Sequence, residues 1–302
     1  MTGPPVGPPS DVVSSTPVGG GDTCTASRLL LADGSVVFAK QRRNPPGNGT
    51  SRRAGWDALL TSEASGLRWL KEAEGNGGAP VPAVVVASEA NLVLQWIEPG
   101  RPTAAAAERL GRELARTHRA GADGFGAPWD GAIGPLPLDN GPVTSGSEHR
   151  WAPFYVSRRI EPYLALAVDA RAIDEEDRRA VEDVVGQIDE LCGPDEPPAR
   201  LHGDLWSGNL VWATESRVWL VDPAAHGGHR ETDLAMLALF GAPHLDRVLD
   251  AYGEEWPLAP GHRRRVALHQ LHPLLVHAAL FGGSYGARAG AAARSALRSD
   301  PG

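Results

Sequence analysis

The chain has 302 residues, of which 42% are hydrophobic and 22% are charged, and its formal net charge at pH 7 is −8. This composition is typical of a soluble globular protein, and no apolar run reaches the roughly 18–20 residues that a membrane helix needs. The acidic balance argues against a general nucleic-acid binder, and two cysteines are too few for a disulfide framework or a zinc cluster. We therefore expect a cytoplasmic protein, a monomer or weak homodimer, with no nucleic-acid or membrane partner.

The first hundred residues predict a small β-rich lobe with one helix. Residues 1–10 are rich in Pro and Gly, lack the apolar stretch of a secretory signal, and are expected to be disordered. Residues 41–55 carry Pro, Gly and Asn and predict a mobile surface loop. Apolar residues at spacings of three and four predict a helix over 57–73. The predicted strands are 11–18, 25–31, 36–40, 83–88 and 91–100.

After Pro102 the pattern becomes helical. Thr103 is the expected N-cap of a helix that ends near residue 119, and Asp174 is the expected N-cap of a helix that ends near residue 191. A long Gly/Pro-rich connection is expected between the first helix and the later ones, at 121–150. The other predicted helices are one near 151–167 and three between 232 and 298. The outline is an α+β chain with two lobes, residues 1–97 and residues 98–302.

The stretch LHGDLWSGNLVW at 201–212 sets polar residues between two apolar ends. The strands NLVW and VWLV on either side of a turn can pair as a hairpin, which would bring Asp222 beside Asn209. An amide oxygen and a carboxylate are the hard ligands that Mg²⁺ takes when it also holds phosphate oxygens. Asp204, at the start of the loop, could accept a proton from a substrate hydroxyl. These residues predict phosphoryl transfer.

A lysine that contacts phosphate completes this pattern. Of the 29 basic residues only Lys40 and Lys71 are lysine, so the chain uses Arg wherever a general positive charge is enough. Lys40 ends a β-like run, SVVFAK, and therefore has a role that Arg does not fill. Glu63, in the helix that follows, is the acid expected to orient it. The alternative for the polar set, two Asx turns flanking a hairpin, explains each residue singly but not their joint spacing.

The motif HGDLWSGN at 202–209, followed by VDPA at 221–224, resembles the fructosamine kinase (ketosamine kinase) family. That family lies in the aminoglycoside phosphotransferase-like branch of the protein-kinase fold. HGD-x4-N alone indicates only the broad superfamily, whereas Trp206-Ser207-Gly208 and HRETDLAM at 229–236 narrow the resemblance. The similar segments run from PVGGG at 17–21 to about residue 288, and they include VFAK, EASGLRWL, LVLQWIEPG, LGRELARTHRAG, WAPFYVSRRI and LHPLLVHAALFGGSY.

The resemblance implies a bilobal protein-kinase-like fold and a kinase that uses ATP and Mg²⁺. The implied substrate is a ketosamine, a ribulosamine or fructosamine adduct of an amine or of lysine. Phosphorylation of its C3 hydroxyl gives a product that breaks down to release the free amine, which is a protein deglycation or repair activity.

The resemblance also implies roles for single residues. Asp204 is the catalytic base, and Asn209 and Asp222 are the metal ligands. Lys40 and Glu63 form the ion pair over the α- and β-phosphates. The remaining assignments are the nucleotide loop Gly19, Gly20 and Gly21, the backbone of Gln95 and Ile97 at the adenine, the substrate residues Trp206, His229, Arg230 and Glu231, and the loop supports His202 and Asp233.

Two other functions stay open at this point. A related small-molecule kinase, of the aminoglycoside or choline phosphotransferase type, would share all of the phosphate machinery. A catalytically dead pseudokinase that serves as a binding module is less favoured, because pseudokinases typically lack the base, the metal-binding Asp or the lysine, and Lys40, Asp204 and Asp222 are all present.

Two smaller features are also ambiguous. Cys24 follows the glycine run and is either a semi-buried strand residue or an exposed thiol whose oxidation would block ATP binding. His269, His272 and His277 suggest a metal site, but their spacing does not place all three on one helical face. No Cys or acid in that segment completes a ligand set, so the metal interpretation is rejected.

Overall fold

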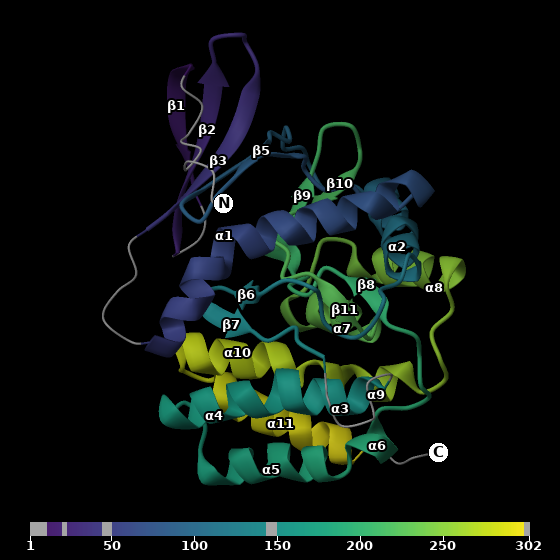
Figure 1. The fold of residues 1–302 in the computed structure, drawn as a ribbon. Coiled ribbons are helices and arrows are strands. Elements are labelled where there is room, and N and C mark those ends of the chain that lie inside the picture. Colours follow the sequence, from purple (N-terminus) through teal and green to yellow (C-terminus); the bar gives the residue numbers. More distant parts are fainter. Residues whose placement is uncertain (1–10, 20–22, 44–49, 143–149, 299–302) are drawn as a thin grey trace.

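The computed structural model describes residues 11–19, 23–43, 50–142 and 150–298. Three expectations concern residues outside these ranges. They are the disorder of residues 1–10, the nucleotide-loop residues Gly20 and Gly21, and part of the 41–55 loop. The described part forms a small sheet-containing lobe above a larger helical lobe, as Figure 1 shows. Within it, no helix combines the length and the apolar character of a membrane-spanning segment.

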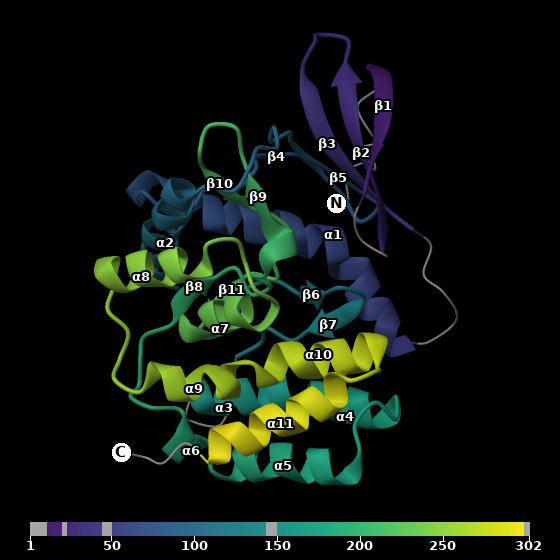
Figure 2. The same ribbon diagram turned by 180° about the vertical axis from the view of Figure 1, so that it is seen from behind.

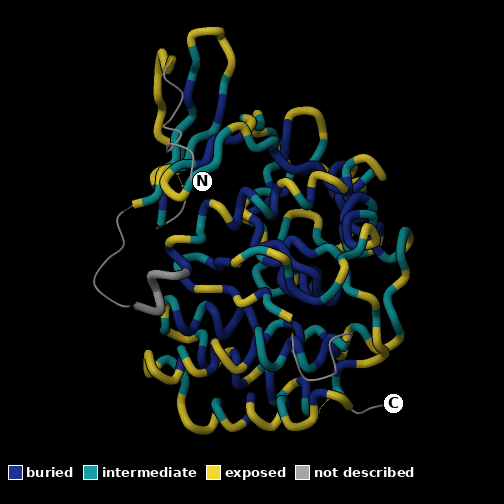
Figure 3. Tube along the Cα trace, viewed as in Figure 1, coloured by how far each residue is buried: buried dark blue, intermediate teal, exposed yellow. Residues whose placement is uncertain are grey.

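The N-terminal lobe is one antiparallel sheet in the order β1-β2-β3-β5-β4. Its outer strand β1 is exposed along nearly its whole length (Figure 3), whereas Leu29, Val37 and Val93 form a small buried cluster in the centre of the sheet. All five predicted strands are present, but the last ends at Gln95 rather than at residue 100. The strands are β1 Val12–Val18, β2 Cys24–Leu31, β3 Val36–Arg42, β4 Val84–Ala87 and β5 Asn91–Gln95.

Helix α1, Thr50–Lys71, lies between the sheet and the C-terminal lobe (Figure 1). The predicted apolar face of this helix is fully buried, including Leu60 and Leu67. The helix starts seven residues before the predicted residue 57, so the expected loop 41–55 is wrong in its last part. The reason is tertiary: at Gly55 the helix packs so closely on the Leu136–Leu138 strand that a Cβ there would lie 2.6 Å from the Pro137 nitrogen.

The C-terminal lobe is mainly helical and contains three short two-stranded antiparallel sheets, β6–β7, β8–β11 and β9–β10. The predicted caps are present, since Thr103 Oγ1 accepts a hydrogen bond from Ala106 N at 3.2 Å and Asp174 Oδ1 accepts one from Asp177 N at 2.8 Å. The strands are β6 Gly131–Ile133, β7 Leu136–Leu138, β8 Ala199–Leu201, β9 Leu210–Trp212, β10 Val218–Leu220 and β11 His226–Gly228. The helices are α2 Ala104–Arg119, α3 Trp151–Tyr155, α4 Glu161–Asp169, α5 Glu175–Gly186, α6 Ile188–Leu191, α7 Glu231–Phe240, α8 Leu245–Glu255, α9 His262–His269, α10 Leu271–Phe281 and α11 Tyr285–Leu297.

The boundaries of these helices correct three expectations. Five helices, not three, lie between 231 and 297. Glycines stand at three of the four breaks, Gly241, Gly261 and Gly282, and Gln270 separates α9 from α10. The predicted 174–191 helix breaks at Gln187 into α5 and α6. The long 121–150 connection contains the β6–β7 hairpin, which packs on α1.

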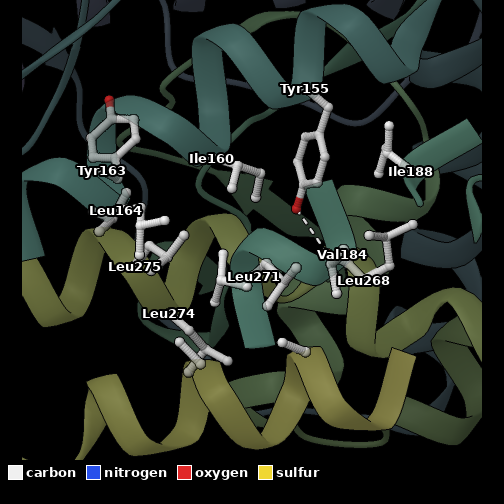
Figure 4. Close-up of a cluster of buried hydrophobic side chains, with 14 of the residues drawn as sticks. Tyr155, Ile160, Tyr163, Leu164, Val184, Ile188, Leu268, Leu271, Leu274 and Leu275 are labelled. Atoms are coloured by element: carbon white, nitrogen blue, oxygen red, sulfur yellow. Dashed lines mark hydrogen bonds between the residues drawn. The ribbon is translucent and has the colours of Figure 1, made fainter. Parts of the chain in front are cut away.

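The core of the C-terminal lobe joins α3, α4, α5, α9, α10 and α11 (Figure 4). Tyr155 is buried in it, and its hydroxyl donates a hydrogen bond to the Leu268 carbonyl at 2.9 Å. A second core links the lobes, because it includes Leu60 of α1, Leu94 of β5 and Leu205 of the loop between β8 and β9, called the catalytic loop below. The site between the lobes is therefore supported by continuous packing on both sides.

We predict that Gly111→Ala destabilises the fold. Helix α2 crosses α8 at Gly111, where an added Cβ would collide with the Val248 carbonyl and lie 2.9 Å from Tyr252 N. Overpacking of this kind costs about 1–3 kcal/mol in the free energy of unfolding, measured by urea denaturation. Gly253→Ala, also in a helix but with open space around it, is the matched control and should be neutral or stabilising by up to about 1 kcal/mol. Equal stability of the two variants would contradict the packing argument.

Candidate active site

A cavity of about 600 Å³ lies between the sheet and the helical lobe. It is lined from above by strands β3 and β5, from the side by α1, and from below by the loop that follows β8 and by the end of the β9–β10 hairpin. Residues of β1, β2 and the β6–β7 hairpin also line it, so many separate segments of the sequence meet there. The predicted site residues on its wall are Gly19, Lys40, Glu63, Gln95, Ile97, Asp204, Trp206, Asn209 and Asp222.

Lys40 is the only cation among the residues that line this cavity, and it holds two carboxylates. Its Nζ donates hydrogen bonds to Glu63 Oε2 at 2.9 Å and Oε1 at 3.0 Å, and it also forms an ion pair with Asp222. Burial would lower the pKa of the ammonium, but the charges of Asp222 and Glu63 outweigh burial and hold it above its usual value. Lys40 therefore stays charged at any physiological pH.

The two carboxyls around Lys40 are not equivalent. Burial raises the pKa of Glu63, and the attraction of Lys40 is too weak to restore the usual value. Asp222 is also affected most by burial, but the charge and hydrogen bond of Lys40 lower its pKa below the usual value. Asp222 is thus the more readily ionised of the two carboxyls. Its side chain is also the more open one, and so the more available to a cation in the cavity.

Asp204 and Asn209 form a second pair. Asn209 Nδ2 donates hydrogen bonds to the Asp204 carbonyl at 2.8 Å and to Asp204 Oδ2 at 3.0 Å, which turns the amide oxygen Oδ1 of Asn209 away from Asp204. Burial raises the pKa of Asp204 to about 7. A carboxyl with a pKa near neutral pH is suited to accept a proton in general base catalysis.

The backbone at Asp222 is strained. Its φ of 57° lies in the left-handed region, which residues other than Gly rarely adopt, and such strain collects at functional sites. The β9–β10 hairpin positions it, since Val221 N donates to the Asn209 carbonyl at 3.1 Å. An amide oxygen from Asn209 and a carboxylate from Asp222, on the wall of one cavity, are a donor set that fits Mg²⁺.

The catalytic loop is held by a buried carboxylate. Asp233 accepts hydrogen bonds from His202 N at 2.7 Å and Gly203 N at 2.9 Å. Behind it, His118 Nε2 lies 3.2 Å from Asp233 Oδ2, and His118 Nδ1 lies 2.9 Å from the Tyr252 hydroxyl. His202 Nε2 donates to the Val221 carbonyl at 2.9 Å, and burial lowers the pKa of this histidine, so it is a neutral support of the loop.

Trp206 lies on the wall of the cavity with 39% of its surface exposed. Its ring covers Gly208, where an added Cβ would lie 2.7 Å from Trp206 Cζ3 and closer still to neighbouring ring atoms. The glycine of the Trp-Ser-Gly motif therefore leaves room for the ring. This geometry gives the motif a physical reason, which sequence spacing alone does not supply.

The other three predicted substrate residues lie outside the cavity wall. His229, Arg230 and Glu231 are all buried. Arg230 forms a bidentate ion pair with Glu196 and donates to the carbonyls of Trp256 and Pro257. These contacts show that the segment holds α7 to the chain before and after it. The expected contact of these residues with substrate is therefore corrected: the polar residues of this segment were mistaken for site residues because the sequence does not show their partners.

The rejected metal interpretation also needs a correction. An acid does join His269, because His229, Glu231 and His269 present ligand atoms within 4.8 Å of one another. Both Glu231 oxygens, however, accept hydrogen bonds from Arg265, at 2.6 and 2.9 Å. This ion pair is sufficient to explain the cluster. His272 lies elsewhere, with Nδ1 3.0 Å from the Arg159 carbonyl.

Three further expectations concern the nucleotide side. Cys24 lines the cavity, but it is buried, and burial raises the pKa of its thiol, so the structure favours a packing residue over an exposed reactive thiol. The hinge segment Gln95–Ile97 borders the cavity, and Gln95 N donates to the Ala83 carbonyl at 2.9 Å. Of the glycine loop, only Gly19 is described, and it lies on the cavity wall.

Sequence reasoning did not find several parts of the site. His118 and Tyr252 support Asp233 from two different helices, and no local pattern marks them. Ile133 and Gly134, at the turn of the β6–β7 hairpin, line the cavity from the long 121–150 connection. The length of that connection predicts that it serves a site or packs on the core, but not which of its residues do so.

Comparisons with known proteins show the family of this chain. The model of the family described as "Fructosamine kinase" matches residues 6–299. The "Probable ketoamine kinase" of Lactiplantibacillus plantarum is 30% identical over 284 residues, which cover 92% of each chain. The "Protein-ribulosamine 3-kinase, chloroplastic" of Arabidopsis thaliana is 31% identical over 280 residues, which cover 89% of this chain and 78% of the relative.

Solved structures extend the likeness to three dimensions. A crystal structure of a candidate fructosamine-3-kinase from Thermobifida fusca superimposes with a TM-score of 0.85 at 48% identity, covering 95% of this chain and 94% of the other. An ADP-bound aminoglycoside phosphotransferase has a TM-score of 0.58 at 13% identity, covering 96% and 94%, which shows the fold alone. The fold is therefore the expected bilobal, protein-kinase-like one.

We predict that Asp204→Asn stabilises the protein above neutral pH. The folded-state pKa of Asp204, about 7, lies above the unfolded value, so the ionised carboxylate opposes folding once the pH exceeds both values. Asn keeps an acceptor for Asn209 Nδ2 and carries no charge. At pH 8 the variant should unfold at a higher urea concentration, by on the order of 1 kcal/mol, and the gain should shrink towards pH 5. A variant less stable than the wild type at pH 8 would show that burial does not penalise this carboxylate.

Proposed function

The chain belongs to the fructosamine kinase family, and from this premise we propose that it transfers the γ-phosphoryl group of ATP to the C3 hydroxyl of a ketosamine. Members of this family are phosphotransferases that act on a hydroxyl group. The ketosamine is an adduct of ribulose or fructose with an amine or a lysine side chain. The observation that carries the proposal is the pairing of a near-neutral carboxyl, Asp204, with Asn209 on the wall of the cavity that also holds Lys40 and Asp222.

The proposed chemistry is a single displacement. The C3 oxygen of the ketosamine forms a bond to the γ-phosphorus, the bond from that phosphorus to the bridging oxygen of ADP breaks, and the hydroxyl proton goes to Asp204. With its pKa near 7, the carboxyl is ionised often enough to accept this proton at neutral pH. Its hydrogen bond from Asn209 Nδ2 fixes the carboxyl, which leaves the second oxygen for the substrate.

The other residues orient the nucleotide in this proposal. Lys40 binds the α- and β-phosphates, and Glu63 holds its ammonium in place. Gly19 lies beside the phosphates, and the backbone of Gln95 and Ile97 meets the adenine, because all three line the same cavity above Lys40. In this structure Asp222 neutralises part of the positive charge of Lys40. Phosphate oxygens that bind near Lys40 would replace part of that interaction.

Asn209 Oδ1 and Asp222 would hold a divalent cation, which we propose is Mg²⁺. When bound, such a cation neutralises the negative charge of the phosphates. Glu63, Asp204 and Asp222 line the same cavity as a single ammonium, that of Lys40, so the described wall carries more acidic than basic groups. These residues therefore provide the electrostatic reason for the cation to bind there with the nucleotide.

The proposed product is a ketosamine 3-phosphate, which breaks down and releases the free amine, so the activity would be protein deglycation or repair. We further propose a cytoplasmic location, since both Cys24 and Cys192 are free thiols, and a monomer or weak homodimer as the assembly. An aminoglycoside or choline-type acceptor has less support, because the likeness to an aminoglycoside phosphotransferase reaches only 13% identity. A pseudokinase is disfavoured by the complete set of Lys40, Asp204 and Asp222.

We predict that Asp204→Asn removes the activity. With Mg-ATP and fructosyl-lysine, kcat should fall about 10²–10⁴-fold, the range for loss of a general base, when ADP release is measured. Asp233→Asn is not a suitable control, because that residue holds the loop; Asp130→Asn, in the 121–142 connection and outside the cavity wall, should keep wild-type rates. Equal rates for Asp204→Asn and wild type would refute the role of the base. Faster wild-type turnover of kanamycin or choline than of fructosyl-lysine would refute the substrate class.

The pH dependence gives an independent test. Because Asp204 must be ionised to accept a proton and its pKa is about 7, kcat/KM should fall towards tenfold per pH unit as the pH drops below 7. Above pH 8 it should reach a plateau on this limb. A flat profile between pH 5.5 and 8, with a stable enzyme, would contradict the assignment.

A further inference from the structure

Five rings form a continuous aromatic stripe that starts at the candidate active site and runs over the surface of the C-terminal lobe. Its members come from four segments: the catalytic loop, the end of α7, α10 and the start of α11 (Figure 2). The stripe consists of Trp206, Phe240, His277, Phe281 and Tyr285.

Each ring contacts the next. The ring centroids are 6.0 Å apart between Trp206 and Phe240 and 4.8 Å apart between Phe240 and His277. From His277 the distance is 5.6 Å to Phe281 and 4.9 Å to Tyr285. These are normal separations for interacting aromatic rings. The stripe is therefore longer than one sugar ring.

The stripe reaches the cavity through Trp206, and Leu280, a chain neighbour of Phe281, lies against the cavity wall. Trp206 itself lines the cavity. Leu280, the residue before Phe281, lies against Gly134, which is also on the cavity wall: an ideal Cβ on Gly134 would be 3.5 Å from Leu280 Cδ1. A group that leaves the cavity beside Trp206 therefore meets the stripe next.

The outer end of the stripe is open and has a built turn. Phe281 is 59% exposed, the second most exposed of the large hydrophobic side chains of the described residues. Gly282 and Gly283 have φ of 62° and 61°, a region that favours glycine, and they turn the chain so that Tyr285 comes back beside Phe281. Exposed apolar rings of this kind commonly mark binding surfaces.

The stripe carries little charge. His277 Nδ1 donates to the Pro273 carbonyl at 2.7 Å, and burial lowers the pKa of this histidine, so its ring is neutral at pH 7. Arg288, whose guanidinium lies 5.4 Å from the Tyr285 ring, is the cation at the outer end. Such a surface favours apolar groups, with an anionic group tolerated near Arg288.

We propose that this aromatic stripe binds the polypeptide segment that carries the ketosamine. The inference rests on the proposed function, which puts the C3 hydroxyl at Asp204 and sends the substituent on the sugar amine out past Trp206. A free amine or amino acid is too short to use the outer rings, whereas apolar residues flanking a modified lysine reach Phe281. The stripe thus makes the enzyme select among glycated lysines by their neighbours in the peptide.

The test compares three acceptors with Mg-ATP, by ADP release. They are N-acetyl fructosyl-lysine and two fructosylated peptides that differ only in having leucine or serine on both sides of the modified lysine. Wild type should show a kcat/KM about tenfold higher for the leucine peptide than for the serine peptide. Phe281→Ser should abolish this preference by raising KM, with kcat unchanged, as expected for loss of binding that is equal in ground and transition states. Phe281→Tyr should retain it.

Val85→Ser is the matched control, because Val85 is 56% exposed on β4 of the other lobe, and it should leave all three rates as they are in wild type. Equal kcat/KM of wild type for the two peptides would overturn the inference. So would a variant of Phe281 that slows all acceptors alike, or a wild-type dimer that Phe281→Ser dissociates while the peptide preference stays intact. Failure of wild type to phosphorylate any of the three acceptors would instead refute the proposed function.

Discussion

The site depends on the ion pairs of the Lys40 ammonium with Glu63 and Asp222, because they join three parts of the chain that are far apart in sequence. Lys40 extends from β3, pairs with Glu63 of α1, and reaches Asp222 beyond the β9–β10 hairpin. A single buried cation between two carboxylates fixes the position of α1 relative to the sheet and to the catalytic segment. Replacing it with a neutral side chain would leave two carboxylates in one cavity without a cation, which is strongly unfavourable.

A second buried charge, that of Asp233, fixes the position of the catalytic loop, as the Lys40 ammonium fixes the position of α1 relative to the sheet. It accepts two backbone N–H groups of the loop, and His118 supports it from α2. Backbone groups near a base are therefore held by the helical core and not by solvent, so the loop keeps its shape when a substrate enters. Burial raises the pKa of Asp204, and the charges of Asp222 and Asp233 raise it further, while the hydrogen bond from Asn209 only partly opposes them.

The fold, and the meeting of the proposed phosphate-side residues on one cavity wall, could be predicted from the sequence to a large extent, since the signals are local. Glycines follow the first strand, the Thr103 and Asp174 caps mark helix starts, and Lys40, Glu63, Asp204, Asn209 and Asp222 sit in motifs with fixed spacing. What could not be predicted depends on contacts between distant segments. The start of α1 depends on how Gly55 meets Pro137. The strained φ of Asp222 follows from the hairpin and is not written in any single residue.

The segment HRETDLAM shows why a motif can indicate a family and still mislead about a site. Its Arg230 and Glu231 have charge partners, Glu196 and Arg265, that lie about 34 residues away in the chain, as the hydrogen bonds record. A polar run with unknown partners looks available for substrate, and only the fold shows that its charges are already matched. The buried ion pairs of Arg230 and Glu231 therefore help to fix the position of α7, and these two side chains do not contact the cavity.

The acceptor side differs from the phosphate side in how it is constrained. Trp206 lies two residues after Asp204 on the loop that Asp233 holds, and Gly208 leaves room for its ring. The proposed base and the ring proposed to meet the acceptor therefore keep a fixed relation. Any acceptor must place its hydroxyl within that relation to react. Variation between substrates is then possible only beyond Trp206, on side chains that α7, α10 and α11 contribute. Because no described residue of those helices lines the cavity, they can change without affecting the proposed transfer step, and the same fold can act on different acceptors.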